Sequence, residues 1–346
     1  MRERVRSVAR LIVRRSVMIA GTTWLVLALL ALPVAGFALF GGPLKSQISD
    51  TLDYTTVRGD DSSSNRILAL SVKGDIDGEP ADAANPDPGV AYGYTIADQL
   101  EKAAGDDGIK AVVLVVDSPG GTIYGARAIA DAVDSYREKT KRPVITEVAG
   151  AADSGAYWAA ASTDAIIADY GTDIGSIGVI SGPFRTYTGV TSLNDPVDGQ
   201  VTAANISSFN ITAGAGKDEG DPYRKLTPEE QANIQRGVDN DYAAFVSFVA
   251  TRRHIAADTI RGKIGAYSYD PTTALSLKLI DKIGGRDAAF GEAAMRAGIK
   301  GDDYQVVEPA EASATASPSA PAGQSAAACR LPNRVAAKQA PRCYNK

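Results

Sequence analysis

The chain has 346 residues, of which 45% are hydrophobic and 22% are charged, a composition typical of one large or two ordinary folded domains. Its formal net charge of -5 argues against a nucleic-acid surface. One histidine and two cysteines are too few for a zinc cluster of these residues, and we expect neither a metal nor a cofactor.

The amino-terminal part combines a basic tail with a long apolar segment. Residues 1–15 contain six arginines, and residues 17–40 contain no charge. As a helix this run would be about 36 Å long, against about 30 Å for the hydrocarbon core of a bilayer. The sequence therefore predicts a transmembrane helix at 16–41, with residues 1–15 in the cytoplasm and all later residues outside it. A cleaved signal peptide is the alternative, because Pro33-Val34-Ala35 resembles a processing site, and the later residues would be exported in that case too.

A stalk is expected at 42–65, where apolar periodicity is weak, and a folded domain from Arg66 onward. Short apolar runs typical of buried strands alternate with segments of helical apolar spacing. The strand-like runs are 67–72, 110–116 and 144–148, and the helical segments between them begin at Tyr94 and Ile123. This alternation predicts an α/β fold with a mostly parallel sheet and right-handed crossover helices.

Two glycine-rich loops follow neighbouring strands of this predicted sheet, one at Gly120-Gly121 and one at Ser154-Gly155. Loops at the carboxyl ends of parallel strands converge, so these two are expected to meet. Ser154 stands between a strand and a helix, where it could be a nucleophile or only a helix N-cap. The N–H groups of Gly121 and Gly155 are candidate donors to an oxyanion, although Pro-Gly-Gly is also a common turn.

A serine nucleophile needs a base, and the only histidine is a poor candidate. His254 follows two arginines late in a long helical pattern, which is typical of a surface position. The base would then be a carboxylate, or a lysine whose pKa is lowered by burial among apolar groups. Composition does not identify which lysine this would be.

Three further motifs occur in order along the chain, Val113–Gly121, Ala152–Trp158 and Thr172–Val179. Together they resemble the signal peptide peptidase A family of S49 serine peptidases, and the similarity covers about 66–301. The resemblance implies a ClpP/crotonase-like fold and a peptidase domain at 66–301. It also implies a Ser/Lys dyad that cleaves peptides at or near the membrane.

Residue by residue, Ser154 matches the nucleophile of the family, and Lys217, in Ile211–Asp218, matches its lysine base. An extra loop at 191–204 lengthens the segment between them. Ser176, in the third motif, either orients this lysine through its hydroxyl or serves only as a turn residue.

Two residues depart from the family pattern around the serine. Ala156 replaces the second glycine of the motif, and Asp153 stands where a small residue is usual. The first change is expected to be tolerated, because the assigned donor is the N–H of Gly155. A carboxylate at Asp153 could instead repel an oxyanion or orient a substrate amine.

The carboxyl-terminal part, 302–346, is predicted to be a disordered linker rich in Ala, Pro and Ser followed by a short basic tail. Cys329 and Cys343 lie in this tail. Outside the cytoplasm a disulfide between them is favoured over two free thiols.

The predicted membrane span and the resemblance together indicate a single-pass protein of the cell membrane, a serine endopeptidase with its catalytic domain outside the cytoplasm. Its implied substrates are apolar peptides such as remnant signal peptides. It is expected to form a homo-oligomeric ring in which Lys217 acts on Ser154 of a neighbouring subunit. The alternatives are a catalytically inactive membrane scaffold of the same fold and a crotonase-like acyl-CoA enzyme, which export of the domain disfavours.

Overall fold

The structure is a computed structural model that describes residues 52–186, 192–195, 199–202 and 209–310. Within these ranges no helix has the length and the apolar character needed to cross a bilayer. The expected membrane span at 16–41 and the cysteine pair Cys329 and Cys343 lie outside the described residues. Of the expected extra loop at 191–204, the structure describes residues 192–195 and 199–202, which form a short hairpin.

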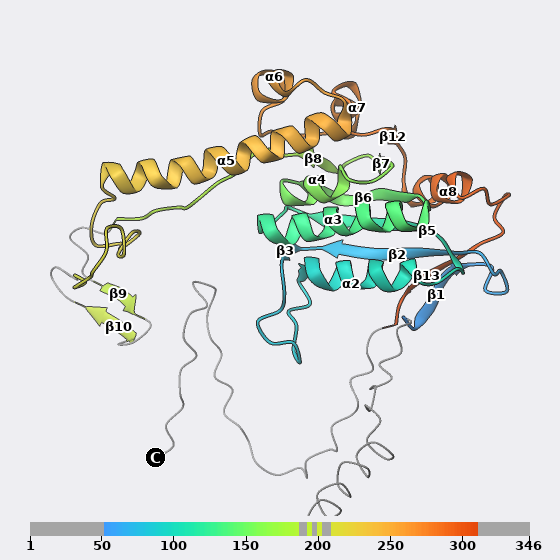
Figure 1. The fold of residues 1–346 in the computed structure, drawn as a ribbon, viewed down its shortest axis with the longest axis horizontal. Helices are drawn as coiled ribbons and strands as arrows, with labels where there is room; N and C mark the ends of the chain where they lie inside the picture. The colour runs from blue at the N-terminus through green and yellow to red at the C-terminus, as the bar shows by residue number, and fades with distance from the viewer. Residues whose placement is uncertain (1–51, 187–191, 196–198, 203–208, 311–346) are drawn as a thin grey trace, which may run out of the picture. The chain divides into compact units, whose positions relative to one another are not determined.

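A nine-stranded, mostly parallel sheet forms the centre of the described chain (Figure 1). The strand order is β1-β13-β2-β5-β6-β7-β12, with β8 beside the end of β6 and β11 beside β8. Only the β1–β13 and β8–β11 pairs are antiparallel. The strands are β1 (Tyr54–Gly59), β2 (Arg66–Lys73), β5 (Ile109–Ser118), β6 (Val144–Asp153), β7 (Ala165–Ala168), β8 (Asp173–Gly175), β11 (Ser268–Tyr269), β12 (Lys282–Ile283) and β13 (Gln305–Pro309).

Two further pairs of short strands stand apart from this sheet. The strands β3 (Asp75–Asp77) and β4 (Val90–Tyr92) pair in parallel. The strands β9 (Ser192–Asp195) and β10 (Gly199–Thr202) form an antiparallel hairpin.

Helices cover both faces of the large sheet, because its central strands carry apolar residues on both sides. One face packs against α2 (Gly93–Ala104), α3 (Ile123–Thr140) and α4 (Gly155–Ala160), and the other packs against α8 (Arg286–Arg296). Successive side chains of β2 alternate between the two faces. Leu68 and Leu70 pack in the core on the side of α2, α3 and α4, and Ile67 and Ala69 pack in the core on the side of α8. The predicted α/β fold, with its parallel strands and crossover helices, is confirmed.

The strands β1, at the edge, and β13, next to it, extend the sheet beyond the limits expected for the domain. Tyr54 pairs with Pro309 and Gly59 with Gln305, and β13 continues in parallel along β2. The sheet therefore includes residues that the sequence interpretation assigned to the stalk and to the carboxyl-terminal linker.

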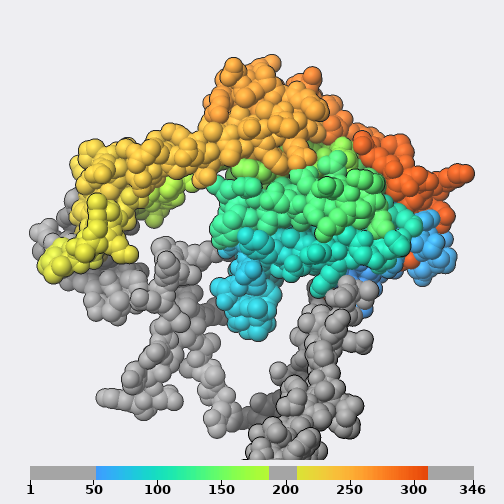
Figure 2. All heavy atoms as spheres, in the orientation of Figure 1, coloured from blue at the N-terminus to red at the C-terminus, as the bar shows by residue number. Residues whose placement is uncertain are grey.

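The longest helix, α5 (Pro228–Arg253), packs on the sheet layer only through its carboxyl-terminal half. Its amino end has a capping box, in which the Thr227 hydroxyl accepts from the Glu230 N–H and the Glu230 carboxylate accepts from the Thr227 N–H. Phe245 stacks on Trp158 of α4 with ring centroids 4.5 Å apart. Figure 2 shows the amino-terminal half of the helix extending beyond the body that the sheet and its helices form.

The segment after α5 closes the chain back onto the sheet. It contains α6 (Ala257–Thr259), a π-helical turn (Ile260–Ile264) and α7 (Pro271–Ser276). His254 is exposed and ends α5 in a left-handed conformation with φ of 54°. It is a helix-ending surface residue, as expected from the sequence.

The Trp158–Phe245 stack is expected to be a main attachment of α5 to the helix that begins beside Ser154. Trp158→Ala should lower the free energy of unfolding by about 3–5 kcal/mol, because it leaves a cavity in a close-packed region. Phe245→Ala should have a similar cost, and the two changes should be less than additive because they remove the same contact. Urea unfolding measures both effects. Tyr170→Ala is the control, since Tyr170 is 76% exposed, and its effect should stay within about 0.5 kcal/mol.

Candidate active site

Ser154 lies at the sharp turn between β6 and α4, in a backbone conformation that L-residues rarely adopt. Its φ is 53° and its ψ is -123°. The turn is held by two backbone hydrogen bonds, from the Ser154 N–H to Gly175 O at 2.9 Å and from the Trp158 N–H to Ser154 O at 3.0 Å. Strain of this kind at a strand-to-helix turn is typical of nucleophile elbows. The Ser154 hydroxyl makes no capping bond to the helix, so the simple N-cap alternative does not describe it.

The loop that contains Gly120 and Gly121 lies directly against this turn, as predicted. A Cβ atom on Gly120 would lie 2.7 Å from the Ser154 Cβ and 2.8 Å from the Gly155 N, so only glycine permits this approach. A Cβ atom on Gly155 would lie 3.4 Å from the Gly121 N. The two glycine-rich loops therefore place the backbone nitrogens of Gly121 and Gly155 close together, next to Ser154.

Neither of these N–H groups donates to a backbone or side-chain acceptor among the described residues. Gly155 is the first residue of α4, so its N–H has no partner within the helix. The Gly120 N–H, in contrast, is bound by the buried hydroxyl of Ser118 at 3.1 Å. Two unpaired donors beside a strained serine are the arrangement that can stabilise a tetrahedral oxyanion.

The short strand β3 fixes this loop from its other side, a contact that the sequence interpretation did not predict. The Ile76 N–H donates to Gly120 O and the Thr122 N–H donates to Ile76 O, each at 2.8 Å. The pattern of a three-residue strand between Gly74 and Gly78 gives no periodicity from which this pairing could be inferred.

Ser176 lies beside the nucleophile turn through the pairing of β6 with β8. Gly175, its neighbour, accepts the Ser154 N–H bond, and the Ser176 N–H donates to Tyr267 O at 2.9 Å. Ser176 is half-buried and has φ of 50°. The structure thus places Ser154, Gly121, Gly155 and Ser176 in one region.

Asp153 turns its side chain toward β11, on the side of β6 away from the Gly121 loop. Its Oδ2 accepts from the Ser268 hydroxyl at 2.8 Å, and its Oδ1 is buried without a hydrogen-bond partner among the described residues. Burial, with a smaller contribution from Asp173, raises the pKa of Asp153. The neutral form of this carboxyl is therefore favoured more than for an exposed aspartate, which reduces the repulsion it would exert on an oxyanion.

Lys217 is exposed and is not brought to Ser154 within one chain. Its neighbour Asp218 binds Arg224, and Arg224 also binds Glu230 in the first turn of α5. Phe245, which packs on the helix of Ser154, lies about 22 Å further along the axis of α5 at 1.5 Å per residue. Figure 1 shows the Lys217 segment (yellow) at this distant amino end of α5. A lysine side chain cannot span that distance.

The ion pair between Arg224 and Glu230, at the amino end of α5, is expected to weaken in acid. Hydrogen bonds from Arg224 lower the pKa of Glu230 from 4.5 to about 2. Because the pKa is lower in the folded state, the stability that this carboxylate contributes is present above pH 4.5 and is lost as the pH falls toward 2. The NMR signal of the Arg224 side-chain N–H should change with a midpoint near 2. In Arg224→Gln, signals of the Thr227–Glu230 capping box should instead change at a higher pH.

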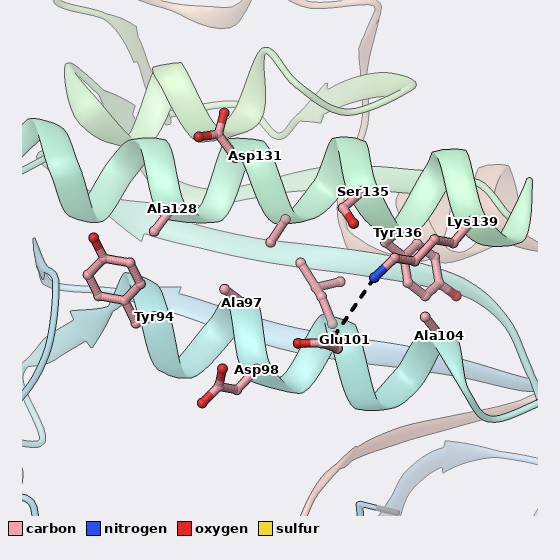
Figure 3. A pocket seen from close by; sticks show the side chains of 12 residues that line it. Tyr94, Ala97, Asp98, Glu101, Ala104, Ala128, Asp131, Ser135, Tyr136 and Lys139 are labelled. Atoms are coloured by element: carbon pink, nitrogen blue, oxygen red, sulfur yellow. Dashed lines mark ion pairs between the residues drawn. The ribbon is translucent and has the colours of Figure 1, made fainter. Parts of the chain in front are cut away.

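The described residues contain no group of three or more His, Cys, Asp or Glu side chains placed to hold a metal ion. A groove of about 300 Å³ runs between α2 and α3 (Figure 3). Its lining includes four alanines, one serine and the Lys139–Glu101 pair, which has 3.9 Å between nitrogen and oxygen. None of the candidate site residues lines it, so this groove is separate from the serine site.

Several known proteins that this chain resembles are named as proteases. Residues 136–300 match the model of peptidase family S49. The chain is 32% identical over 199 residues to a Methanocaldococcus jannaschii protein named as a protease. The aligned region is 58% of this chain and 59% of that protein. It is 32% identical to protease 4 of Haemophilus influenzae, over 72% of this chain and 36% of that protein. It is 26% identical to the chloroplastic serine protease SPPA of Arabidopsis thaliana, over 55% of this chain and 26% of that protein.

These matches span less than two thirds of the length of each relative. A solved membrane-bound stomatin-specific protease superposes with a TM-score of 0.37 and 17% identity over 66% of this chain and 84% of that chain, which is too distant to support an argument. The family match includes Ser154, Gly155, Ser176 and Lys217. On the sequence similarity, residues 136–300 of this chain belong to peptidase family S49.

Proposed function

We propose that this chain is a membrane-anchored serine endopeptidase that cleaves apolar peptides, such as remnant signal peptides, outside the cytoplasm. The observation that supports it most is Ser154, held in a strained turn beside the unpaired N–H groups of Gly121 and Gly155. Family membership supports the reaction class. The apolar run at 16–41 and the arginines before it support the anchor and its orientation.

In the proposed reaction, the neutral amine of Lys217 takes the proton of the Ser154 hydroxyl as Oγ attacks the carbonyl carbon of a peptide bond. The N–H groups of Gly121 and Gly155 bind the resulting oxyanion. The Lys217 ammonium then gives its proton to the leaving amine, and an acyl ester remains on Ser154. Water, deprotonated by the same amine, hydrolyses this ester and restores the serine.

The lysine in this reaction is supplied by a neighbouring subunit. Lys217 of the same chain precedes α5 and lies near its distant amino end, and the amino-terminal half of α5 has mostly exposed residues. Within that half, Ile234 and Val238 are only partly exposed and lie one helical turn apart. An assembly in which this half of α5 lies on the next subunit would cover them. Ser176 beside Ser154 would be available to orient the incoming amine.

The experiment that tests this proposal is cleavage of a fluorogenic apolar peptide by the full chain in detergent micelles, with the products identified by mass spectrometry. Turnover, together with covalent labelling of Ser154 by a serine-directed fluorophosphonate, is the expected result. An assembled chain that neither cleaves a range of apolar peptides nor labels at Ser154 would favour the inactive scaffold. Membership of a peptidase family counts against the acyl-CoA enzyme.

A further inference from the structure

Asp77 ends the short strand β3 next to the loop that carries Gly121, and its side chain gathers three donors. Asp77 Oδ1 accepts from the Tyr124 hydroxyl at 2.6 Å, from the Gly78 N–H at 2.8 Å and, more weakly, from the Thr122 hydroxyl at 3.4 Å. Tyr124 and Thr122 come from the first turn and the N-cap of α3. The carboxylate therefore ties β3 to the residues that immediately follow Gly121.

The backbone on either side of Gly121 is fixed by the same strand. Ile76 binds Gly120 through its N–H and Thr122 through its carbonyl oxygen, so Gly121 lies between two bonds to one residue. A Cβ atom on Gly121 would lie 2.0 Å from Ile76 O, so the contact is as close as backbone allows. Any shift of β3 would move the Gly121 N–H with it.

The charge on Asp77 strengthens this attachment. The Tyr124 hydrogen bond is the main cause that lowers the pKa of Asp77, so the group is a carboxylate at neutral pH. A phenol bound to a carboxylate at 2.6 Å is a charge-assisted hydrogen bond, stronger than a bond between neutral groups. Thr122 in turn accepts from the Gly125 N–H and caps α3. One carboxylate thus joins the end of β3, the Gly121 loop and the start of α3.

We propose that Asp77 and Tyr124 are positioning residues of the oxyanion site, which hold β3 and Thr122 so that the Gly121 N–H is aimed before the substrate reacts. The inference rests on the proposed function, since it requires an oxyanion at Ser154. Its physical reason is that a donor stabilises a transition state only if it is already in place, because reorganisation during the reaction would cancel the gain. Neither side chain needs to touch the substrate.

The test compares two ligands that differ only in whether they form an oxyanion. A peptide aldehyde adds to Ser154 and places its oxygen in the site, whereas the matching peptide alcohol binds without adding. Their dissociation constants are measured by calorimetry, without need of turnover. The aldehyde advantage is the ratio of the Kd of the alcohol to the Kd of the aldehyde. In Asp77→Ala this ratio should fall about tenfold, while the Kd of the alcohol stays within about twofold of wild type. In Tyr124→Phe it should fall about threefold, and Asp77→Asn, which keeps an acceptor oxygen, should recover part of the loss.

Asp82→Ala is the matched control, because Asp82 lies in the loop after β3 and its hydrogen bonds stay within that loop, to Ala84 and Asn85. It should leave the aldehyde advantage unchanged. An unchanged advantage in both Tyr124→Phe and Asp77→Ala would overturn the positioning role, and so would a loss that affects the alcohol equally. If Asp77→Ala does not fold, Tyr124→Phe decides, because it removes one hydroxyl from a side chain that is 55% exposed. No aldehyde advantage in the wild type would instead overturn the proposed nucleophile, and this inference with it.

Discussion

Ser154→Ala is expected to lower kcat for peptide cleavage by about 10⁴-fold or more, with peptide binding nearly unchanged. The covalent step has no substitute nucleophile at this turn, and what remains is the effect of the oxyanion donors on attack by water. The measurement is single-turnover cleavage of a fluorogenic peptide, with peptide binding followed separately by fluorescence anisotropy. Ser247→Ala, at an exposed position of α5, is the control and should retain full activity.

The strain at this position gives the same experiment a second readout. A residue with φ of 53° and ψ of -123° is costly for any side chain but not for glycine. Ser154→Gly should therefore be as inactive as Ser154→Ala. Its free energy of unfolding, measured in urea, should nevertheless be about 1 kcal/mol higher than that of the wild type. A Ser154→Ala chain that keeps substantial activity would remove Ser154 as the nucleophile. A Ser154→Gly chain less stable than wild type would show that the turn is not strained.

The sequence was sufficient to predict that the two glycine-rich loops meet. Parallel strands run in one direction, so the ends of β5 and β6 lie at the same edge of the sheet, and Gly120 and Ser154 follow those ends. The apolar runs that became β2, β5 and β6 were recognisable because both of their faces are buried. The surface position of His254 was predictable from local residues alone.

The support behind Gly121 was not predictable in the same way. Its basis is a three-residue strand whose parallel partner, β4, follows a loop rich in proline and glycine. Asp77 is the last residue of β3. Its role depends on Tyr124, which is distant in sequence, and no local pattern links an aspartate after one strand to a tyrosine in the next helix but one. Such contacts follow from tertiary packing, which sequence periodicity does not encode.

The distance between Lys217 and Ser154 also follows from tertiary structure. The motifs alone suggested a dyad, but they do not say how far α5 carries its amino end from the sheet. The helix is held at its carboxyl-terminal half by the Phe245 stack, by a bidentate pair between Arg253 and Asp281 and by the Arg252–Asp134 pair. With that end fixed, the rest of a 26-residue helix must project away from the serine. The proposed shared site between subunits would reconcile both motifs with one reaction.

Co-expression of two inactive chains is expected to restore activity if the site is shared. Ser154→Ala and Lys217→Ala should each be inactive as a uniform assembly, because every site then lacks one of the two groups. In a random equal mixture, about one quarter of the sites would combine an intact serine with an intact lysine from the next subunit, as a head-to-tail ring allows. The measurement is peptide cleavage by the purified mixed assembly, with its composition determined by mass spectrometry.

The matched controls separate this arrangement from its alternatives. A chain that carries both changes, co-expressed with Ser154→Ala, should give no activity, since no intact serine is present. Lys225→Ala, which removes an exposed lysine close to Lys217, should remain active alone. If the mixed assembly forms but stays inactive, both groups must come from one chain, and α5 would then have to bend or move for Lys217 to reach Ser154. Full activity of Lys217→Ala alone would instead show that another group is the base, and the partly buried residues around Ser154 would be the place to look for it.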